Sequence, residues 1–428
     1  MKRTILATLA LICAATAAPA KAPPVSDSAI VEAYQYMLAR WLVLRQEARD
    51  FDEGFKWNVL VARAPGDAAT SNPNFDVALS EAWIAVDDES CTLITLPEIK
   101  DRYYTIEIVD GWGEVIDNVN DRTYLGHPSG TFALCLDKAK VTLPAGAQRV
   151  EVAGNTSRIL ISIGLGADPA GALALQKQIT MTVTGSPKID DAVVKPDFAD
   201  DKLPGVEAFD KTDAILASEA DINKDLDEPR AMARAVGLAA GDPDQRAHID
   251  DVIHNVAIPA FLAAIPKMGR TVDGWFMPRL LGNYGSEYLM RSVIDYTNIW
   301  ANGSREVIFF KNTGIDGSQT YTQTFSKGEL PVLWARYFWS VTAVDAKDRR
   351  VIANPLNRYQ FNSQSGLKFN ADGSLTLVFA PKLPDGVPQS NWLPTAPGQT
   401  YNLTYRFYAP AKDVVLGRYY PPLLSIQP

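Results

Sequence analysis

The chain has 428 residues, of which 47% are hydrophobic and 21% are charged, and its formal net charge is -9 at pH 7. This length is too great for one ordinary hydrophobic core, so we expect two or three domains. The composition is typical of a globular protein and excludes extended disorder. An acidic surface repels phosphate groups, which excludes nucleic acid from the expected partners.

Residues 1–22 have the layout of a secretory signal peptide. Lys2 and Arg3 precede a short apolar run that ends in small residues, with an Ala-x-Ala-like sequence at 20–22. This pattern predicts cleavage after Ala22 and a periplasmic or secreted mature chain. An uncleaved anchor is the alternative. The run is shorter than the ~20 residues of a membrane helix, and we expect no membrane insertion of the mature chain.

Residues 23–56 are predicted to hold one amphipathic helix, from about residue 26 to residue 51. Ser26 and Asp27 supply the start signal. Apolar residues then recur at helical spacing: Ile30, Tyr34, Met37, Leu38, Trp41 and Leu44. We expect this apolar face to pack on the sheets that follow.

Residues 57–185 are predicted to form a β-sandwich domain. Strand-like segments such as VALSEAWIAV, CTLITL, RYYTIEIVD, TFALCL and RILISIG alternate with turn clusters at the spacing of an antiparallel sandwich. A short helix at 168–178 and a strand at 180–184 complete the domain. Cys91 and Cys135 both lie in strand-like surroundings. A disulfide between them is permitted in an oxidising compartment, and two buried free thiols are the alternative.

Residues 186–300 are predicted to be a linker and a helical module. The segment 186–204 is acidic and contains proline, whereas 206–300 has mainly helical patterns, strongest at 244–264 and again at 286–297. Residues 301–428 return to short strands with long connections, which favours a jelly roll. The predicted fold is therefore mostly β, with a helical segment between two β domains.

The sequence offers little for familiar catalytic chemistry. His127, His248 and His254 do not stand at metal-site spacings, and no Gly-x-Ser-x-Gly sequence occurs. We therefore expect no metal and no cofactor. Polar and aromatic residues in loops remain as candidate ligand-binding residues: Asn74, Asp76, Arg102, Tyr104, Asp110, Trp112, Asn391, Trp392 and Arg406. Aromatic faces beside polar groups suit a small polar ligand or glycan, but turn capping is an alternative role for these residues.

Several segments occur in an order that resembles a known family. The N-terminal half contains NPNFDVALSEAWIAVDDESCTLITLPEIKDRYYTIEIVDGW, and the C-terminal half contains FWSVTAVD, NPLNRYQF and YNLTYRFYAP. They resemble an exported two-part family, domain of unknown function 1254 followed by domain of unknown function 1214. The resemblance implies an immunoglobulin-like N-terminal sandwich, a helical segment and a C-terminal jelly roll, but no established reaction. Val77 and Leu79 stand where the family usually has Thr and Tyr.

Three functions fit these observations. The first is an exported protein that binds a small polar or carbohydrate-like ligand between its two β domains. The second is a hydrolase or lyase acting on an envelope or extracellular polymer, with Asp76 and Asp110 as an acid-base pair. The third is a structural protein that forms homo-oligomers. Whether the protein is an enzyme stays open at this point.

Overall fold

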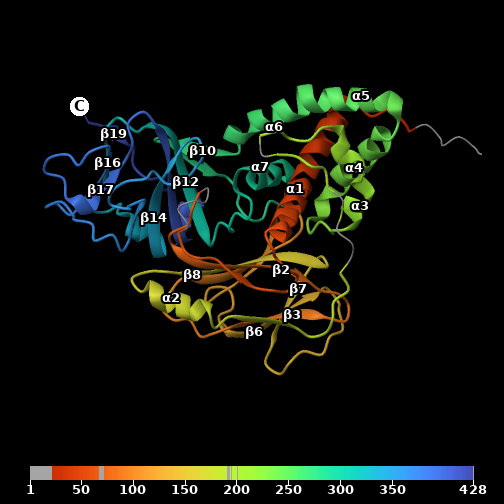
Figure 1. The fold of residues 1–428 in the computed structure, drawn as a ribbon, viewed down its shortest axis with the longest axis horizontal. Coiled ribbons are helices and arrows are strands. Elements are labelled where there is room, and N and C mark those ends of the chain that lie inside the picture. The colour runs from red at the N-terminus through yellow and green to blue at the C-terminus, as the bar shows by residue number, and fades with distance from the viewer. Residues whose placement is uncertain (1–21, 67–71, 190–192, 194, 200, 428) are drawn as a thin grey trace, which may run out of the picture.

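The computed structural model describes residues 22–427 except 67–71, 190–192, 194 and 200. The predicted signal peptide therefore lies outside the described residues, apart from Ala22. The chain is mostly β, as predicted, and two β domains adjoin a group of helices. Figure 1 shows the N-terminal domain in orange and yellow, the C-terminal domain in blue, and the helices beside both.

The N-terminal helix, α1 (Asp27–Asp52), begins where the sequence predicts. The Ser26 hydroxyl accepts a hydrogen bond from the Ala29 backbone N–H at 3.2 Å, which caps the first turn. The prediction that α1 packs on sheets is largely wrong. It is buried mainly against the helices α4 (Asp227–Ala240) and α7 (Tyr288–Asn298). Its contacts with the N-terminal domain include Tyr36 on Trp112, with ring centroids 4.9 Å apart, and Val43 on Trp83. Arg40 also donates to the Gly111 carbonyl at 2.8 Å.

The N-terminal domain is a sandwich of two sheets around one apolar core. The five-stranded sheet has the order β1 (Val61–Ala62), β2 (Val77–Ala85), β8 (Thr156–Gly164), β4 (Tyr104–Val109) and β5 (Val115–Val119). The four-stranded sheet has the order β7 (Gln148–Val152), β6 (Gly130–Leu136), β3 (Cys91–Leu96) and β9 (Thr180–Val183). The short helix α2 (Pro169–Gln176) precedes β9. The sandwich is not wholly antiparallel, because β6 and β7 pair in parallel.

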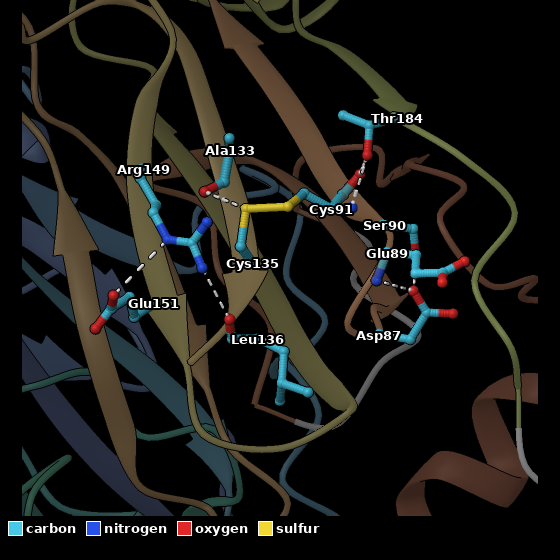
Figure 2. The surroundings of a disulfide bond; sticks show 10 residues. All are labelled: Asp87, Glu89, Ser90, Cys91, Ala133, Cys135, Leu136, Arg149, Glu151 and Thr184. Atoms are coloured by element: carbon cyan, nitrogen blue, oxygen red, sulfur yellow. Dashed lines mark hydrogen bonds and ion pairs between the residues drawn. A yellow bond between two sulfur atoms is a disulfide. The ribbon is translucent and has the colours of Figure 1, made fainter. Parts of the chain in front are cut away.

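A disulfide joins β3 to β6 (Figure 2). Cys91 and Cys135 are opposite one another in the strand register, their Cα atoms are 4.6 Å apart, and their sulfur atoms are 2.09 Å apart. Of the two alternatives that the sequence leaves open, the structure has the disulfide. A bond across this chain separation contributes roughly 2–4 kcal/mol to stability, because it restricts the unfolded chain.

The helical region follows the sandwich, as predicted. It comprises η1 (Val206–Phe209), α3 (Thr212–Ala217), η2 (Lys224–Leu226), α4, α5 (Pro243–Val252), η3 (Ile253–Ala257), α6 (Ile258–Ala264), η4 (Ile265–Lys267) and, after a hairpin, α7. The continuous stretch Pro243–Lys267 is long and apolar enough to cross a membrane, and 28% of its most apolar window is buried. Here it packs on α1 and α4. Core helices of soluble proteins meet the same criterion, so this is weak support for a membrane span.

The C-terminal domain also has two sheets. The larger has the order β10 (Gly269–Val272), β11 (Trp275–Pro278), β12 (Val307–Asp316), β18 (Thr400–Pro410), β14 (Ala335–Asp345) and β15 (Gln360–Asn362). The smaller has the order β17 (Trp392–Pro394), β16 (Leu375–Ala380), β13 (Tyr321–Phe325) and β19 (Ser425–Ile426). Short helical turns η5 (Pro331–Trp334), η6 (Gln389–Asn391) and α8 (Lys412–Val415) lie in its loops. The hairpin β10–β11 departs from the predicted boundary, because it falls in the segment assigned to helices but pairs with β12.

The larger C-terminal sheet has two chemically different faces. Side chains alternate between the faces of a strand, so Phe310, Tyr405 and Val341 point into the apolar core of the domain. Their neighbours Lys311 and Thr404 point to the opposite face. Further along that face, Val307, Phe338 and Tyr408 pack against Val77 and Tyr103 of the N-terminal domain. The polar face of this sheet therefore borders the interface between the two β domains.

Candidate functional site

Asp76 lies just before β2 and joins the N-terminal domain to the polar face of the C-terminal sheet. The residue is only 3% exposed. One carboxylate oxygen accepts hydrogen bonds from the Ser340 hydroxyl at 2.6 Å and from the Tyr408 hydroxyl at 3.1 Å, and the other accepts from the Gln360 amide at 3.2 Å. Three hydrogen-bond donors satisfy this buried carboxylate, so its first role is to hold the two domains together.

Two other predicted site residues lie in the same interface. The Asn74 side-chain oxygen accepts from the Asp76 backbone N–H at 2.8 Å, and its amide donates to the Tyr408 hydroxyl at 3.3 Å. Arg406, on β18, is buried and donates to the Thr342 hydroxyl at 2.8 Å. The structure thus brings together Asn74, Asp76 and Arg406. Val77, where the family usually has Thr, contacts the apolar part of this interface.

A basic cleft of about 580 Å³ opens beside these residues. We define it by four cationic residues from three parts of the chain: Arg45 and Arg49 on α1, Lys311 on β12, and Arg349 in the loop after β14. The amides of Asn72, Asn298 and Asn402 and the hydroxyls of Thr313 and Thr404 also line it. Sequence reasoning selected none of these residues.

Most titratable residues that line the basic cleft are cationic. Asp295, on α7, is the one carboxyl group among the described lining residues, and burial raises its pKa well above the usual range. Burial therefore disfavours its charged form. Burial, together with the nearby charges of Arg406 and Arg349, lowers the pKa of Lys311 to about 8. A cleft lined by four basic side chains and one carboxyl group favours an anionic ligand.

Asp110 and Trp112 lie elsewhere, in a buried charge network between the sandwich and the helices. Asp110 is 0% exposed and accepts hydrogen bonds from the backbone N–H groups of Trp112 and Glu114 at 2.8 and 2.9 Å. Burial, together with the charge of Glu114, raises the pKa of Asp110 to about 7. The guanidinium of Arg291 lies 4.7 Å from the centre of the Trp112 ring.

The other predicted residues have local structural roles. Arg102 donates to the carbonyl oxygens of Gly164 and Leu165 at 2.7 and 2.8 Å, which secures the end of β8. Tyr104 donates to the Pro128 carbonyl at 2.7 Å.

In the C-terminal domain, the Asn391 side chain pairs with the backbone of Lys368, and the Trp392 ring N–H donates to the Ala380 carbonyl. These interactions correspond to turn and edge roles, so the nine predicted residues do not form one site.

The proposed acid-base pair does not have the required geometry. Asp76 and Asp110 are both buried and lie in separate hydrogen-bond networks rather than in one open cleft. A glycosidase-like mechanism needs two carboxyl groups that flank a bound substrate. Nothing in the described residues supports that use of this pair.

A second cavity, of about 320 Å³, lies beside α1 and is lined largely by apolar groups such as Leu44, Phe51 and Trp57. Arg40 and Glu47 also reach it. Its rim includes Ile189 and Val193, next to residues outside the described ranges. The basic cleft is the stronger candidate, because three of its four cations lie on α1 and β12.

The protein belongs to the class with two β domains and a helical region between them. A known family matches each β domain. Residues 57–183 match the family described as "Protein of unknown function (DUF1254)", and residues 311–412 match "Protein of unknown function (DUF1214)". The chain therefore belongs to the two-part family that carries these domains in this order.

The fold is also found in solved structures. The crystal structure of the VPA0106 protein from Vibrio parahaemolyticus is similar, with a TM-score of 0.70 and 18% identity, over 94% of this chain and 100% of that one. A structure of an uncharacterised protein from Burkholderia cenocepacia has a TM-score of 0.44 and 12% identity, over 94% of this chain and 95% of that one. No curated protein matches the chain.

Proposed function

We propose that this protein binds a small, hydroxylated, anionic ligand, such as an acidic sugar, in the basic cleft between the helices α1 and α7 and the larger sheet of the C-terminal domain. The observation that carries the proposal is the convergence of Arg45, Arg49, Lys311 and Arg349 on one cavity of about 580 Å³. The whole chain has a net charge of -9, so this local excess of cations opposes the overall charge. Like charges at close range repel one another, and a bound anion would relieve that repulsion.

The other residues that line the cleft suit the hydroxyl groups of such a ligand. Side-chain amides both donate and accept hydrogen bonds, as sugar hydroxyls do. Asn298 and Asn402 provide such amides, and Thr404 provides a hydroxyl. The interface between two domains is a preferred place for a ligand pocket. The Asp76 network beside the cleft joins the N-terminal domain to the sheet that forms one wall of the cleft.

Calorimetric titration with three anions, D-galacturonate, citrate and inorganic phosphate, tests this proposal. D-galactose serves as the neutral counterpart of galacturonate. We expect at least one anion to bind, with the binding weakened by salt, and galactose to bind at least tenfold less tightly than galacturonate. Replacing Arg349 with Gln removes one charged donor, so it should weaken anion binding by about tenfold.

Arg350→Gln is the matched control, because Arg350 is exposed, adjoins Arg349 and does not line the cleft. It should leave the dissociation constant unchanged. The proposal is wrong if none of the three anions binds, or if the two arginine variants have the same effect.

We also propose that the protein is exported and that the mature chain begins at Pro23. The leader-like sequence at 1–22 and the Cys91–Cys135 disulfide support this, because disulfides persist in oxidising compartments. N-terminal sequencing of the protein isolated from its own host should start at Pro23. A chain that starts at Met1 in the cytoplasm would contradict export. Homo-oligomer formation stays an untested prediction.

A further inference from the structure

We propose that Lys311 is a reactive amine that forms an imine with the carbonyl group of a small 2-oxo acid held in the basic cleft. This inference rests on the proposed function, because the cleft must hold the acid's carboxylate. It goes further in assigning a covalent site to one residue and in naming the ligand class as a carbonyl-bearing acid with a short apolar group.

Lys311 lies where two cavities of different character meet. It lines the basic cleft, and it also lines an adjoining cavity of about 150 Å³. That second cavity is otherwise mainly apolar, with Met268, Phe276 and Phe309 among its lining residues. A ligand whose carbonyl carbon is at Lys311 could therefore place its charged end in one cavity and its apolar end in the other.

The backbone holds Lys311 firmly. Its strand, β12, is paired on both sides, with Phe276 of β11 opposite on one side and Thr404 of β18 opposite on the other. A reactive group on a paired strand is positioned more precisely than one on a loop. Among the described residues, Lys311 makes no hydrogen bond or ion pair that would occupy its amine.

The charges around Lys311 favour the neutral amine. Arg406, from β18, and Arg349, from the loop after β14, are the charged groups that lower its pKa. Arg45 and Arg49 of α1 and Asp295 of α7 line the same cleft, and burial raises the pKa of Asp295. With the pKa lowered to about 8, roughly a tenth of the Lys311 side chains are unprotonated at pH 7, far more than for an ordinary lysine. Burial beside cationic groups is a known way to activate a lysine for attack on a carbonyl.

The step balances without an oxidant or a reductant. The Lys311 Nζ lone pair attacks the carbonyl carbon and forms a carbinolamine. One proton of the amine moves to the oxygen as the carbinolamine forms. The hydroxyl group then leaves as water with the second amine proton, and a carbon–nitrogen double bond remains. Protonation of the imine nitrogen would make the adjacent carbon electron-poor, and the neighbouring arginines would hold the ligand carboxylate.

Reductive trapping with pyruvate and sodium cyanoborohydride, followed by peptide mass spectrometry, tests the inference. We expect pyruvate to modify Lys311 at least tenfold faster than the exposed Lys347 of the same chain. The rate at Lys311 should fall as pH drops below about 8, because the amine becomes protonated. Arg349→Gln should slow the trapping several-fold by weakening carboxylate binding.

Lys311→Arg is the matched variant, because it keeps a positive charge but has no amine that forms an imine. It should abolish trapping at this position, whereas Arg350→Gln, outside the cleft, should leave trapping at Lys311 unchanged. If Lys311 is trapped no faster than Lys347, the imine inference is wrong, but the proposal of anion binding is unaffected. If the parent protein shows neither trapping nor anion binding, the proposed function is wrong as well.

Discussion

Replacing Arg291 with Met should lower the free energy of unfolding by about 3–5 kcal/mol. Arg291 on α7 is completely buried, and its guanidinium donates to Asp221 at 3.1 Å and to Glu114 at 3.5 Å. Removing this charge leaves two carboxyl groups in a site that water does not reach. Urea unfolding followed by tryptophan fluorescence measures the loss.

Arg279→Met is the matched control for this prediction. Arg279 pairs with Glu287 at 2.6 Å through both guanidinium ends, but both side chains are about half exposed. An exposed pair contributes about 0–1 kcal/mol. If the two substitutions cost the same, the buried charge network does not hold the sandwich to the helices as described.

The protein should become less stable as pH rises from about 5 to 8. Burial raises the pKa of Asp110 to about 7 and the pKa values of Glu107 and Glu219 to about 8. Each group therefore binds its proton more tightly in the folded chain than in the unfolded chain, where carboxyl pKa values are about 4. Their contribution is complete below the unfolded pKa and is lost as pH approaches the folded pKa.

Each such group changes the free energy of unfolding by up to about 1.4 kcal/mol per pH unit within its window. Glu107→Gln should therefore make the dependence of urea stability on pH less steep between pH 5 and 8. The control Glu151→Gln, at an exposed position on β7, should leave the slope of the parent protein unchanged. A parent protein whose stability is flat or rises over this range would contradict the prediction.

Much of the fold could be predicted because its signals are local. The Ser26 cap marks the start of α1, and the alternation around Phe310 and Lys311 marks a strand with two different faces. The hairpin at 269–278 was missed, although its turn carries a signal. Asp273 and Gly274 both have positive φ, of 51° and 81°, and Asp-Gly is a favoured hairpin turn. Four-residue strands give too little periodicity to outweigh the helical patterns on either side.

The candidate site was harder to predict, because its residues come from distant segments. Asn74 and Asp76 stood out as a polar pair before a strand, and they do meet Arg406 at the domain interface. The cations of the basic cleft had no such local pattern. Arg45 looks like one side chain on an amphipathic helix, and Lys311 like one polar position on a strand. Only the complete fold, which places α1 beside the larger C-terminal sheet, brings them together.

A crystal structure with a brominated carboxylate, such as 3-bromopropionate, would test the central claim most directly. The bromine position can be found from its anomalous scattering, independently of the protein density. We expect the bromine signal in the basic cleft, with the carboxylate in contact with Arg349 or Lys311. Bromine found only outside this cleft, with the cleft empty, would contradict the claim that this protein binds anions between α1, α7 and the C-terminal sheet.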